Sequence, residues 1–181
     1  MEKRGWIEVV CGPMFAGKSE ELIRRIKRMQ YAKKKFLVFK PLIDDRYSNT
    51  QLVSHDKNGV DSINAASSKD VLAHINDDLD AIVIDEVQFL DDEIVNVCDE
   101  FAKKGVRVIC GGLDNNFKDE PFLITAKLMS RAEQVTKLTA ICVKCGEPAT
   151  CTQRLINGKP ASKKDPIILD EKEELFINKT L

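Results

Sequence analysis

The sequence has no long apolar run and almost no net charge. Its 181 residues include 28 Lys and Arg against 29 Asp and Glu, a formal net charge of -1, so the charge does not favour nucleic acid as a partner. No apolar stretch approaches the roughly 18 residues that a membrane-spanning helix needs. The first ten residues, MEKRGWIEVV, lack the apolar stretch of a secretory signal peptide. We therefore expect a cytoplasmic protein with neither a membrane nor a nucleic-acid partner.

Histidine and cysteine are also scarce, with two and six residues respectively. In a cytoplasmic protein the cysteines are expected to be reduced. Cys11, Cys98 and Cys110 lie in apolar or helix-like contexts and are predicted to be small core residues. The other three cysteines lie together between residues 142 and 151, and the histidines at positions 55 and 74 are far from them in the sequence.

Apolar strands alternate with helical segments over the first two thirds of the chain. The patterns predict strands over 6–11, 36–40, 81–84 and 106–110, and helices over 19–31, 67–75 and 91–104. This alternation indicates an α/β fold, in which a parallel sheet has helices on both faces. Ligands of such sheets bind at the carboxyl ends of the strands.

After Gly112 the alternation ends. One further helix is predicted over 124–134, followed by turn-rich, strand-like sequence. We therefore expect a nucleotide-binding domain over 1–135 and a small lobe over 136–181.

A phosphate-binding motif lies between the first predicted strand and the first predicted helix. The residues are Gly12, Pro13, Met14, Phe15, Ala16, Gly17, Lys18 and Ser19, which match G-x-x-x-x-G-K-[ST]. In this motif backbone N–H groups converge on phosphate oxygens, and the helix N-terminus adds a partial positive charge. Lys18 would contact the β- and γ-phosphates, and the Ser19 hydroxyl would ligate magnesium. A glycine turn before a surface lysine is the alternative, but the strand and helix around the motif favour ATP and Mg²⁺ in a P-loop NTPase (RecA-like) fold.

A second polar motif follows the apolar strand over 81–84, and we assign its residues Asp85, Glu86, Val87 and Gln88 to the nucleotide site. Asp85 is placed to hold magnesium through water. Glu86 could accept a proton from an attacking hydroxyl or water, a step worth about 10²–10⁴-fold in rate. The two carboxylates could instead merely cap the strand, but the phosphate motif upstream favours the catalytic interpretation.

Six segments resemble the thymidine kinases of the homotetrameric type found in bacteria, animal cytosol and poxviruses. They are GPMFAGKSEELIRR, KPLIDDRYS, IDEVQFLDDEIV, GGLDNNFKDEPF, AEQVTKLTAICVKCG and TQRLINGKPA, in family order between Gly5 and Pro166. The resemblance implies ATP-dependent phosphorylation of the thymidine 5′-hydroxyl, a homotetramer and feedback inhibition by thymidine triphosphate. It makes Glu86 the general base, with Lys18 and Arg46 as the other catalytic residues.

The resemblance also implies a nucleoside site. Arg46, supported by Asp44, would steady the phosphoryl group and the 5′-oxygen. The other implied contacts are Met14 and Phe89 in the wall of the base pocket, Leu113 beneath it, Gln88 near the nucleoside, Phe117 and Phe122 on a "lasso" segment that closes over the base, and Thr152 near the thymine methyl. Aromatic residues on a closing loop suit an apolar pocket that excludes water. Without the resemblance, the two phenylalanines could simply anchor their loop, and Arg46 could be a surface arginine.

The C-terminal segment departs from the family pattern. The backbone groups that hold the thymine correspond by count to Ile167, Ile168, Leu169, Asp170 and Glu171, and the aromatic residue that packs on the base corresponds to Phe176. Asp170 and Glu171 replace an apolar residue and a glycine, and a lost glycine can forbid the required backbone angle. Leu123 also stands where the family has glycine. The nucleotide half is therefore expected to be intact and the nucleoside half altered.

The pair Cys142 and Cys145 corresponds to half of the family's zinc site, which gives the small lobe a zinc-ribbon-like character. Structural zinc takes four ligands. Thr180 falls where the third ligand is expected, Cys151 is a possible substitute, and no fourth ligand is evident. Two states are open: zinc bound by this pair, or reduced cysteines without metal in a loose lobe.

Three functions follow from these patterns. The first is a thymidine kinase, the second a kinase for another deoxynucleoside or a small alcohol, and the third a nucleotide-binding paralogue without turnover. The altered tail favours the second and third. The joint presence of Lys18, Ser19, Arg46, Asp85 and Glu86 favours an enzyme, and we predict a thymidine kinase.

Overall fold

The computed structural model describes residues 4–42, 51–53, 59–76, 78–167 and 175–179. Several predicted site residues lie outside these ranges. They are Asp44, Arg46, Ile168, Leu169, Asp170 and Glu171, together with Thr180 of the expected zinc site.

A six-stranded sheet forms the centre of the molecule, in the order β5-β2-β6-β7-β1-β8. The strands are β1 (Trp6–Gly12), β2 (Phe36–Pro41), β5 (Ile63–Ala65), β6 (Ala81–Ile84), β7 (Arg107–Leu113) and β8 (Gln134–Lys137). All neighbouring pairs are parallel. Buried parallel strands read as continuous apolar runs, and all four residues of β6 are buried. The predicted α/β class is confirmed.

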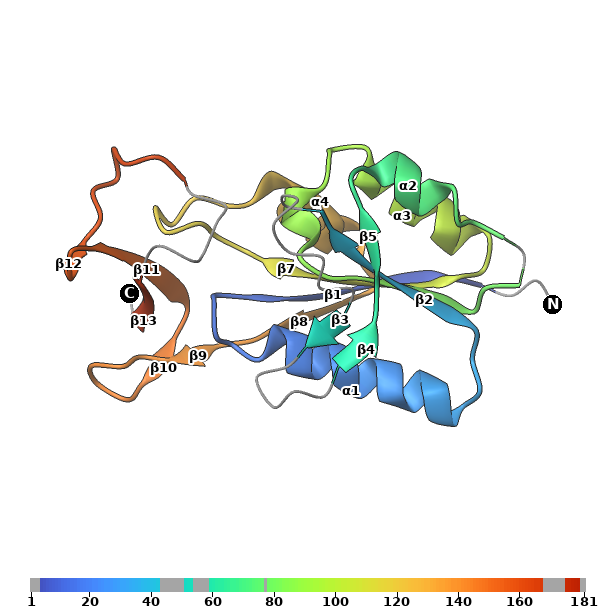
Figure 1. Ribbon diagram of the computed structural model, residues 1–181, viewed down its shortest axis with the longest axis horizontal. Helices are drawn as coiled ribbons and strands as arrows, with labels where there is room; N and C mark the ends of the chain where they lie inside the picture. The colour runs from blue at the N-terminus through green and yellow to red at the C-terminus, as the bar shows by residue number, and fades with distance from the viewer. Residues whose placement is uncertain (1–3, 43–50, 54–58, 77, 168–174, 180–181) are drawn as a thin grey trace.

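Helices cover both faces of this sheet (Figure 1). Helix α1 (Lys18–Tyr31) lies on one face, and α2 (Ser68–Leu72), α3 (Ile94–Lys103) and α4 (Leu123–Arg131) lie on the other. Alternate residues of a strand face opposite sides. Accordingly Val10 of β1 packs in the α1-side cluster with Leu22 and Ile26, while Val9 packs in the opposite cluster with Ile94 and Phe101. Burial of both faces stabilises the sheet.

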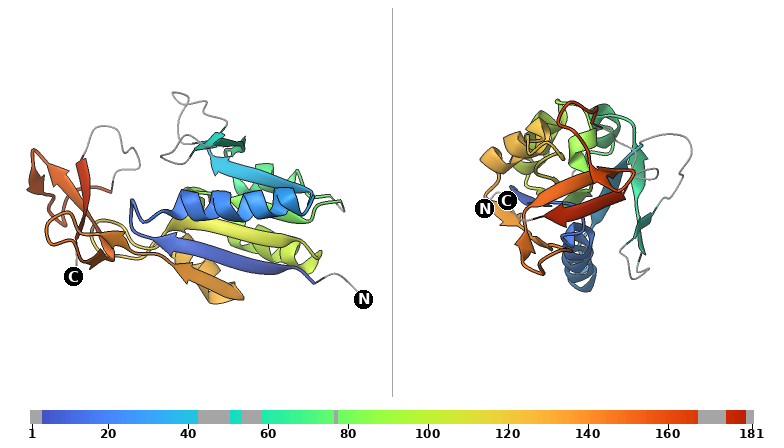
Figure 2. Two further views of the ribbon diagram at one scale, coloured as in Figure 1. Left: turned by 90° about the horizontal axis from the view of Figure 1, so that it is seen from below. Right: turned by 90° about the vertical axis from the view of Figure 1, so that its left-hand side faces the viewer.

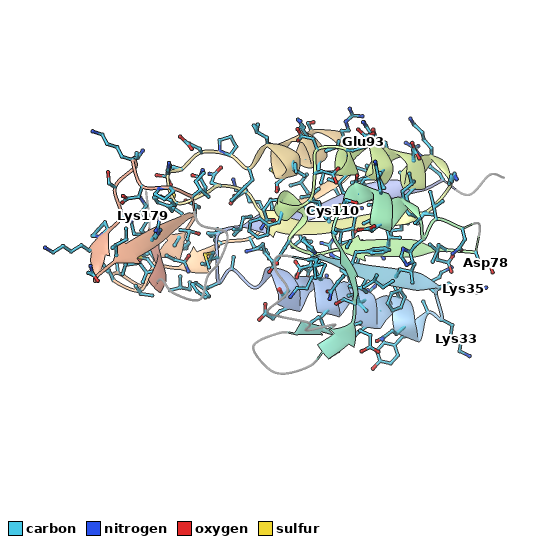
Figure 3. All side chains as sticks on the ribbon, turned by 45° about the horizontal axis from the view of Figure 1, so that its top comes forward. Lys33, Lys35, Asp78, Glu93, Cys110 and Lys179 are labelled. Atoms are coloured by element: carbon cyan, nitrogen blue, oxygen red, sulfur yellow. The ribbon has the colours of Figure 1, made fainter. Side chains whose placement is uncertain are left out.

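The three predicted core cysteines are buried, as expected. Cys98 and Cys110 contact each other, with 3.7 Å between their Sγ atoms. Figure 3 shows Cys110 in the interior of the molecule. The hydrogen bond with the neighbouring Cys110 thiol and burial raise the pKa of Cys98 well above its usual value, so Cys98 is a neutral thiol packed as a small apolar residue.

Two predicted helices differ from the observed ones at their ends. Helix α2 begins after Ser67, whose side chain forms the predicted N-terminal cap in a capping box with Asp70, but the helix ends at Leu72. Helix α4 ends at Arg131 instead of residue 134. The reason is that Gln134–Lys137 forms β8, which pairs with β1. The predicted domain boundary between residues 135 and 136 therefore falls inside a strand of the main sheet.

The small lobe lies beyond the carboxyl ends of the sheet strands (Figure 2). It contains the hairpin β9 (Ala140–Ile141) and β10 (Pro148–Ala149), and a three-stranded sheet in the order β12-β11-β13. These strands are β11 (Cys151–Ile156), β12 (Lys159–Pro160) and β13 (Leu175–Lys179). A separate hairpin of β3 (Gln51–Val53) and β4 (Gly59–Asp61) lies near α1. Of the helices in the described ranges, none is both long and apolar enough to cross a bilayer.

Candidate nucleotide and phosphoryl-transfer site

The phosphate motif forms the loop between β1 and α1, as the sequence predicts. Gly17 is the N-terminal cap of α1 and has a φ of 82°, and Phe15 has a φ of 58°. Gly12 lies against the backbone of Leu138, which follows β8. A Cβ built on Gly12 would lie 2.5 Å from the backbone oxygen of Leu138. A side chain at residue 12 would therefore displace this backbone. The loop brings the N-terminus of α1 to the carboxyl end of β1, where an anion is favoured.

Lys18 is held by the loop itself. Its Nζ donates a hydrogen bond to the backbone oxygen of Pro13 at 2.6 Å. Because Lys18 is the first residue of α1, its ammonium group stays beside the loop and helix N-terminus. It can exchange the Pro13 carbonyl for a phosphate oxygen without a change in the fold.

The strand order brings the two predicted motifs together. Strand β7 lies between β1 and β6, so the loop after β1 and the residues after β6 lie two strands apart. Gly111 of the intervening strand β7 leaves room for Asp85, because a Cβ added to Gly111 would lie only 3.0 Å from Asp85 Oδ1. Ser19 Oγ donates to Asp85 Oδ2 at 3.5 Å. A hydroxyl and a carboxylate at this spacing are suitable ligands for one magnesium ion, directly or through water.

Asp85 is buried at this point, with 3% of its surface exposed. Burial raises the pKa of Asp85, although Lys40, the Glu86 amide, Lys18 and Ser19 act against this effect. The Glu86 N–H donates to Asp85 Oδ1 at 2.9 Å. A bound cation would favour the ionised form of this carboxyl group.

Glu86 adopts a left-handed backbone conformation, with a φ of 49°. Only a few per cent of residues other than glycine have a positive φ, and such strain is concentrated at functional sites. The conformation joins β6 to the short 3₁₀ helix η1 (Val87–Phe89). Glu86 is half-buried, so part of its side chain is accessible at this end of the sheet.

Gln88 ties η1 to the end of β7. Its Oε1 accepts a hydrogen bond from the backbone N–H of Leu113 at 3.1 Å, and the side chain is buried. Phe89 and Phe122 form an edge-to-face pair with ring centroids 6.2 Å apart. These four residues, all predicted to lie near the nucleoside, are thus brought together beside the Glu86 segment.

The loop that carries Phe117 is held by its own polar groups. Asn116 Oδ1 accepts from the N–H groups of Lys118 and Glu120 at 2.8 and 3.2 Å. Phe117 is buried, and the guanidinium of Arg154 lies over its ring at 5.3 Å from the centroid. Arg154 also donates to the backbone oxygen of Pro166 at 2.6 Å. The guanidinium group of the small lobe thus covers the ring of Phe117.

Thr152 lies against the phosphate-binding loop. Its Oγ1 accepts a hydrogen bond from the backbone N–H of Met14 at 3.0 Å, and both residues are buried. Ile167 is 42% exposed, and Phe176 lies on β13. Met14 and Thr152, both implied to lie at the base, are thus in direct contact through the Met14 N–H hydrogen bond.

The cysteine pair does not make a complete metal site in the described part of the chain. Cys142 is buried and Cys145 is exposed. Among the described residues, no group of three or more His, Cys, Asp or Glu side chains could hold a metal ion. The residues placed by the structure therefore do not fit the four-ligand zinc site that the resemblance implies.

Several contacts of this site were not predicted. The hydrogen bond between Thr152 and Met14 joins residues 138 positions apart, and no local pattern indicates it. Asp114, just after β7, pairs with Lys137 at the end of β8 at 3.1 Å. The parallel strand order could have suggested this pair, had β8 been recognised as a sheet strand.

The family comparison agrees with this geometry. The family model described as thymidine kinase matches residues 5–176, which spans the phosphate-binding loop, the Asp85–Glu86 segment and nearly all of the small lobe. The chain therefore belongs to the thymidine kinase family, and it is a phosphotransferase that phosphorylates a nucleoside.

Proposed function

We propose that the protein transfers the γ-phosphoryl group of ATP to the 5′-hydroxyl of thymidine, giving ADP and thymidine monophosphate. The main support is the convergence of two motifs at one edge of the sheet, where Ser19 Oγ lies 3.5 Å from Asp85 Oδ2 and Glu86 follows directly. Family membership supports thymidine as the acceptor. The same membership supports a homotetramer and inhibition by thymidine triphosphate, and the sequence supports a cytoplasmic location.

Several groups of the chain would bind and orient the triphosphate. The N-terminus of α1 and the loop N–H groups would bind phosphate oxygens, and Lys18 would leave the Pro13 carbonyl to contact them. Ser19 and Asp85 would hold magnesium. When bound, this ion neutralises charge that develops on the phosphate oxygens.

Glu86 would act as the general base. It would accept the proton of the 5′-hydroxyl while the 5′-oxygen bonds to the γ-phosphorus and the bond to the β,γ-bridging oxygen breaks, so that ADP leaves. The Phe89–Phe122 pair, Met14 and Leu113 would supply the apolar wall for the base. We also assign Arg46 and Asp44 to the phosphoryl group, and residues 167–171 and Phe176 to the base, on the strength of the family resemblance.

The test is a coupled ATP assay with thymidine, deoxyuridine and deoxycytidine as acceptors. We expect thymidine to be used best. Glu86→Gln should lower kcat by about 10²–10⁴-fold and leave the affinity for Mg·ADP unchanged. Glu93→Gln is the matched control, because Glu93 is an exposed glutamate at the start of α3 (Figure 3).

Each contrary result has a definite meaning. Faster turnover of another nucleoside would contradict thymidine as the acceptor, but it would support phosphoryl transfer to a nucleoside. Nucleotide binding with no acceptor used would contradict the proposal, as would full activity of Glu86→Gln.

A further inference from the structure

We propose that Thr152 is a positioning residue for the phosphate-binding loop, so that nucleotide affinity depends on the docking of the small lobe. Thr152 lies on β11 in the lobe, and the loop joins β1 to α1. The inference rests on the nucleotide site of the proposed function. It does not depend on which nucleoside is the acceptor.

The link is the peptide group between Pro13 and Met14, which is held at both of its polar atoms. Its N–H donates to Thr152 Oγ1 at 3.0 Å. Its carbonyl oxygen accepts from Lys18 Nζ at 2.6 Å. A trans peptide is planar, with its N–H and C=O on opposite sides, so any rotation that moves one group moves the other. Thr152 therefore sets the orientation of the carbonyl that holds Lys18.

Burial makes this hydrogen bond important for the shape of the loop. Met14 and Thr152 are 8% and 5% exposed, so water cannot easily replace the threonine oxygen. A buried backbone N–H without a partner is costly. The next residue, Phe15, has a φ of 58°, a conformation that needs support from its surroundings.

The segment that leads into the lobe holds the other side of the loop. The N–H of Leu138 donates to the Cys11 oxygen at 2.8 Å, and the Leu138 oxygen lies against Gly12. Leu138 lies between β8 and β9. The start of the loop is thus enclosed by the lobe connection on one side and by Thr152 on the other.

Two consequences follow for binding. A loop already held in one conformation loses less entropy when it binds phosphate, which strengthens binding. Any ligand that changes the position of β11 must also change nucleotide affinity, and by linkage the nucleotide changes the affinity for that ligand to the same degree. Thr152 thereby couples the small lobe to Lys18.

The test compares Thr152→Val with Thr152→Ser by isothermal titration calorimetry of Mg·ADP without nucleoside. Valine keeps the shape of threonine but lacks the oxygen, whereas serine keeps the oxygen. We expect binding about tenfold weaker for Thr152→Val, which equals about 1.4 kcal/mol and is a usual value for one buried hydrogen bond. Thr152→Ser should bind within about twofold of the wild type. If Thr152 served only as a nucleoside contact, Thr152→Val would leave Mg·ADP affinity unchanged, and this result would overturn the proposal.

Hydrogen exchange in the wild-type protein supplies a second measurement that requires no variant. The Met14 amide should exchange at least about 100-fold more slowly than in an unstructured peptide, because it is buried and bonded. Rapid exchange of this amide in the folded protein would contradict the proposal. Neither measurement depends on the acceptor assay. An absence of thymidine phosphorylation would therefore contradict the proposed function but not this inference.

Discussion

The sheet domain and the small lobe differ in how they are stabilised. In the sheet domain, large aliphatic and aromatic side chains fill two clusters, one on each face of the sheet. Among the lobe side chains whose burial the structure describes, at positions 138–167 and 177–179, the buried apolar ones are only Ala140, Cys142, Ala149 and Cys151. Two alanines and two cysteines bury little apolar area, and stabilisation by burial is proportional to that area. The lobe therefore depends on its contacts with the sheet domain.

Side chains of the lobe contact the sheet domain at several points in the described part of the chain. Thr152 accepts a hydrogen bond from the Met14 N–H. The guanidinium of Arg154 covers the ring of Phe117. Lys179 forms an ion pair with Asp119 at 3.6 Å. Figure 3 shows Lys179 at the lobe end of the molecule, far from the Lys35–Asp78 pair at the other end. The sheet domain thus has a large apolar core of its own, whereas the described part of the small lobe is held mainly by its contacts with that domain.

The largest expected effect comes from a change within the sheet domain. Lys18→Met should lower kcat by about 10²–10³-fold, because one positioned cation at the transferred phosphate is lost. Lys27→Met, on the exposed face of α1, is the control. The coupled assay gives kcat, and urea denaturation should show equal stability for both variants. Near wild-type turnover in Lys18→Met would show that the loop is not the phosphate site.

The second prediction compares ion pairs in the two regions. Glu8 is buried in β1, where Arg107 Nε donates to it at 2.7 Å and Arg25 contacts its other oxygen. Glu8→Gln leaves the Arg107 guanidinium without its anion, while Arg25 keeps its pair with Glu21 at 2.8 Å, and should cost about 3 kcal/mol of unfolding free energy. Lys179→Met removes a half-exposed pair and should cost at most about 1 kcal/mol. An equal loss of unfolding free energy in Glu8→Gln and Lys179→Met would contradict the expected difference between the sheet domain and the small lobe.

The same glutamate predicts a dependence on pH. Burial alone would raise the pKa of Glu8, but hydrogen bonds from Arg107 and Trp6 and the charges of Arg107 and Arg25 outweigh burial and lower it. A lowered carboxyl pKa contributes stability above the unfolded value of about 4.3, and this stability is lost as the pH falls through the folded value. The difference between wild type and Glu8→Gln should therefore shrink below about pH 4. A difference that is constant from pH 7 to pH 3 would exclude this explanation.

Two glycines give a further test. An added Cβ on Gly12 would lie 2.5 Å from the Leu138 oxygen, whereas one on Gly146 would meet nothing within 4 Å. Gly12→Ala should thus destabilise the protein by about 3 kcal/mol through crowding. Gly146→Ala should cost about 1 kcal/mol through its φ of 76° alone. Urea denaturation measures both values, and a reversed order would contradict the structure of the loop.

The smallest expected effect concerns the cysteine pair. Cys145 is exposed, so Cys145→Ser should change stability by less than about 0.5 kcal/mol. A metal chelator should leave Tm unchanged, because the described residues contain no group of three or more His, Cys, Asp or Glu side chains that could hold a metal ion. Metal analysis of the purified protein is the control. Near-stoichiometric zinc, or a clear loss of Tm with chelator, would show that the lobe is metal-stabilised after all.

Elements whose signal in the sequence is local have the predicted positions. Strand β6 has the predicted bounds, Ala81–Ile84, because four consecutive apolar residues followed by Asp85 mark a buried strand and its end. Ser67 caps α2 as expected, since a cap needs only residues within one turn. Asp85 and Glu86 were placed correctly at the sheet edge because carboxyl ends of parallel strands share that edge.

The sequence pattern failed where a distant partner decides. Residues 134–137 were assigned partly to a helix and partly to the lobe, yet they pair with β1. The buried charge of Glu8 could not be explained in advance, because Arg25 and Arg107 lie 17 and 99 residues away. The bond from Met14 to Thr152 spans 138 residues.

Residue order alone thus established the phosphate motif, the carboxylates after β6, the α/β class and the family resemblance, because each depends on patterns within short segments and on the order of those segments along the chain. Only the folded chain determined that β7 lies between the strands that carry the two motifs. The hydrogen bond from the Pro13–Met14 peptide to Thr152 of the lobe was likewise decided by the fold. Such contacts form when elements far apart in the chain pack together, and their free energy comes from burial and hydrogen bonds that no short segment contains.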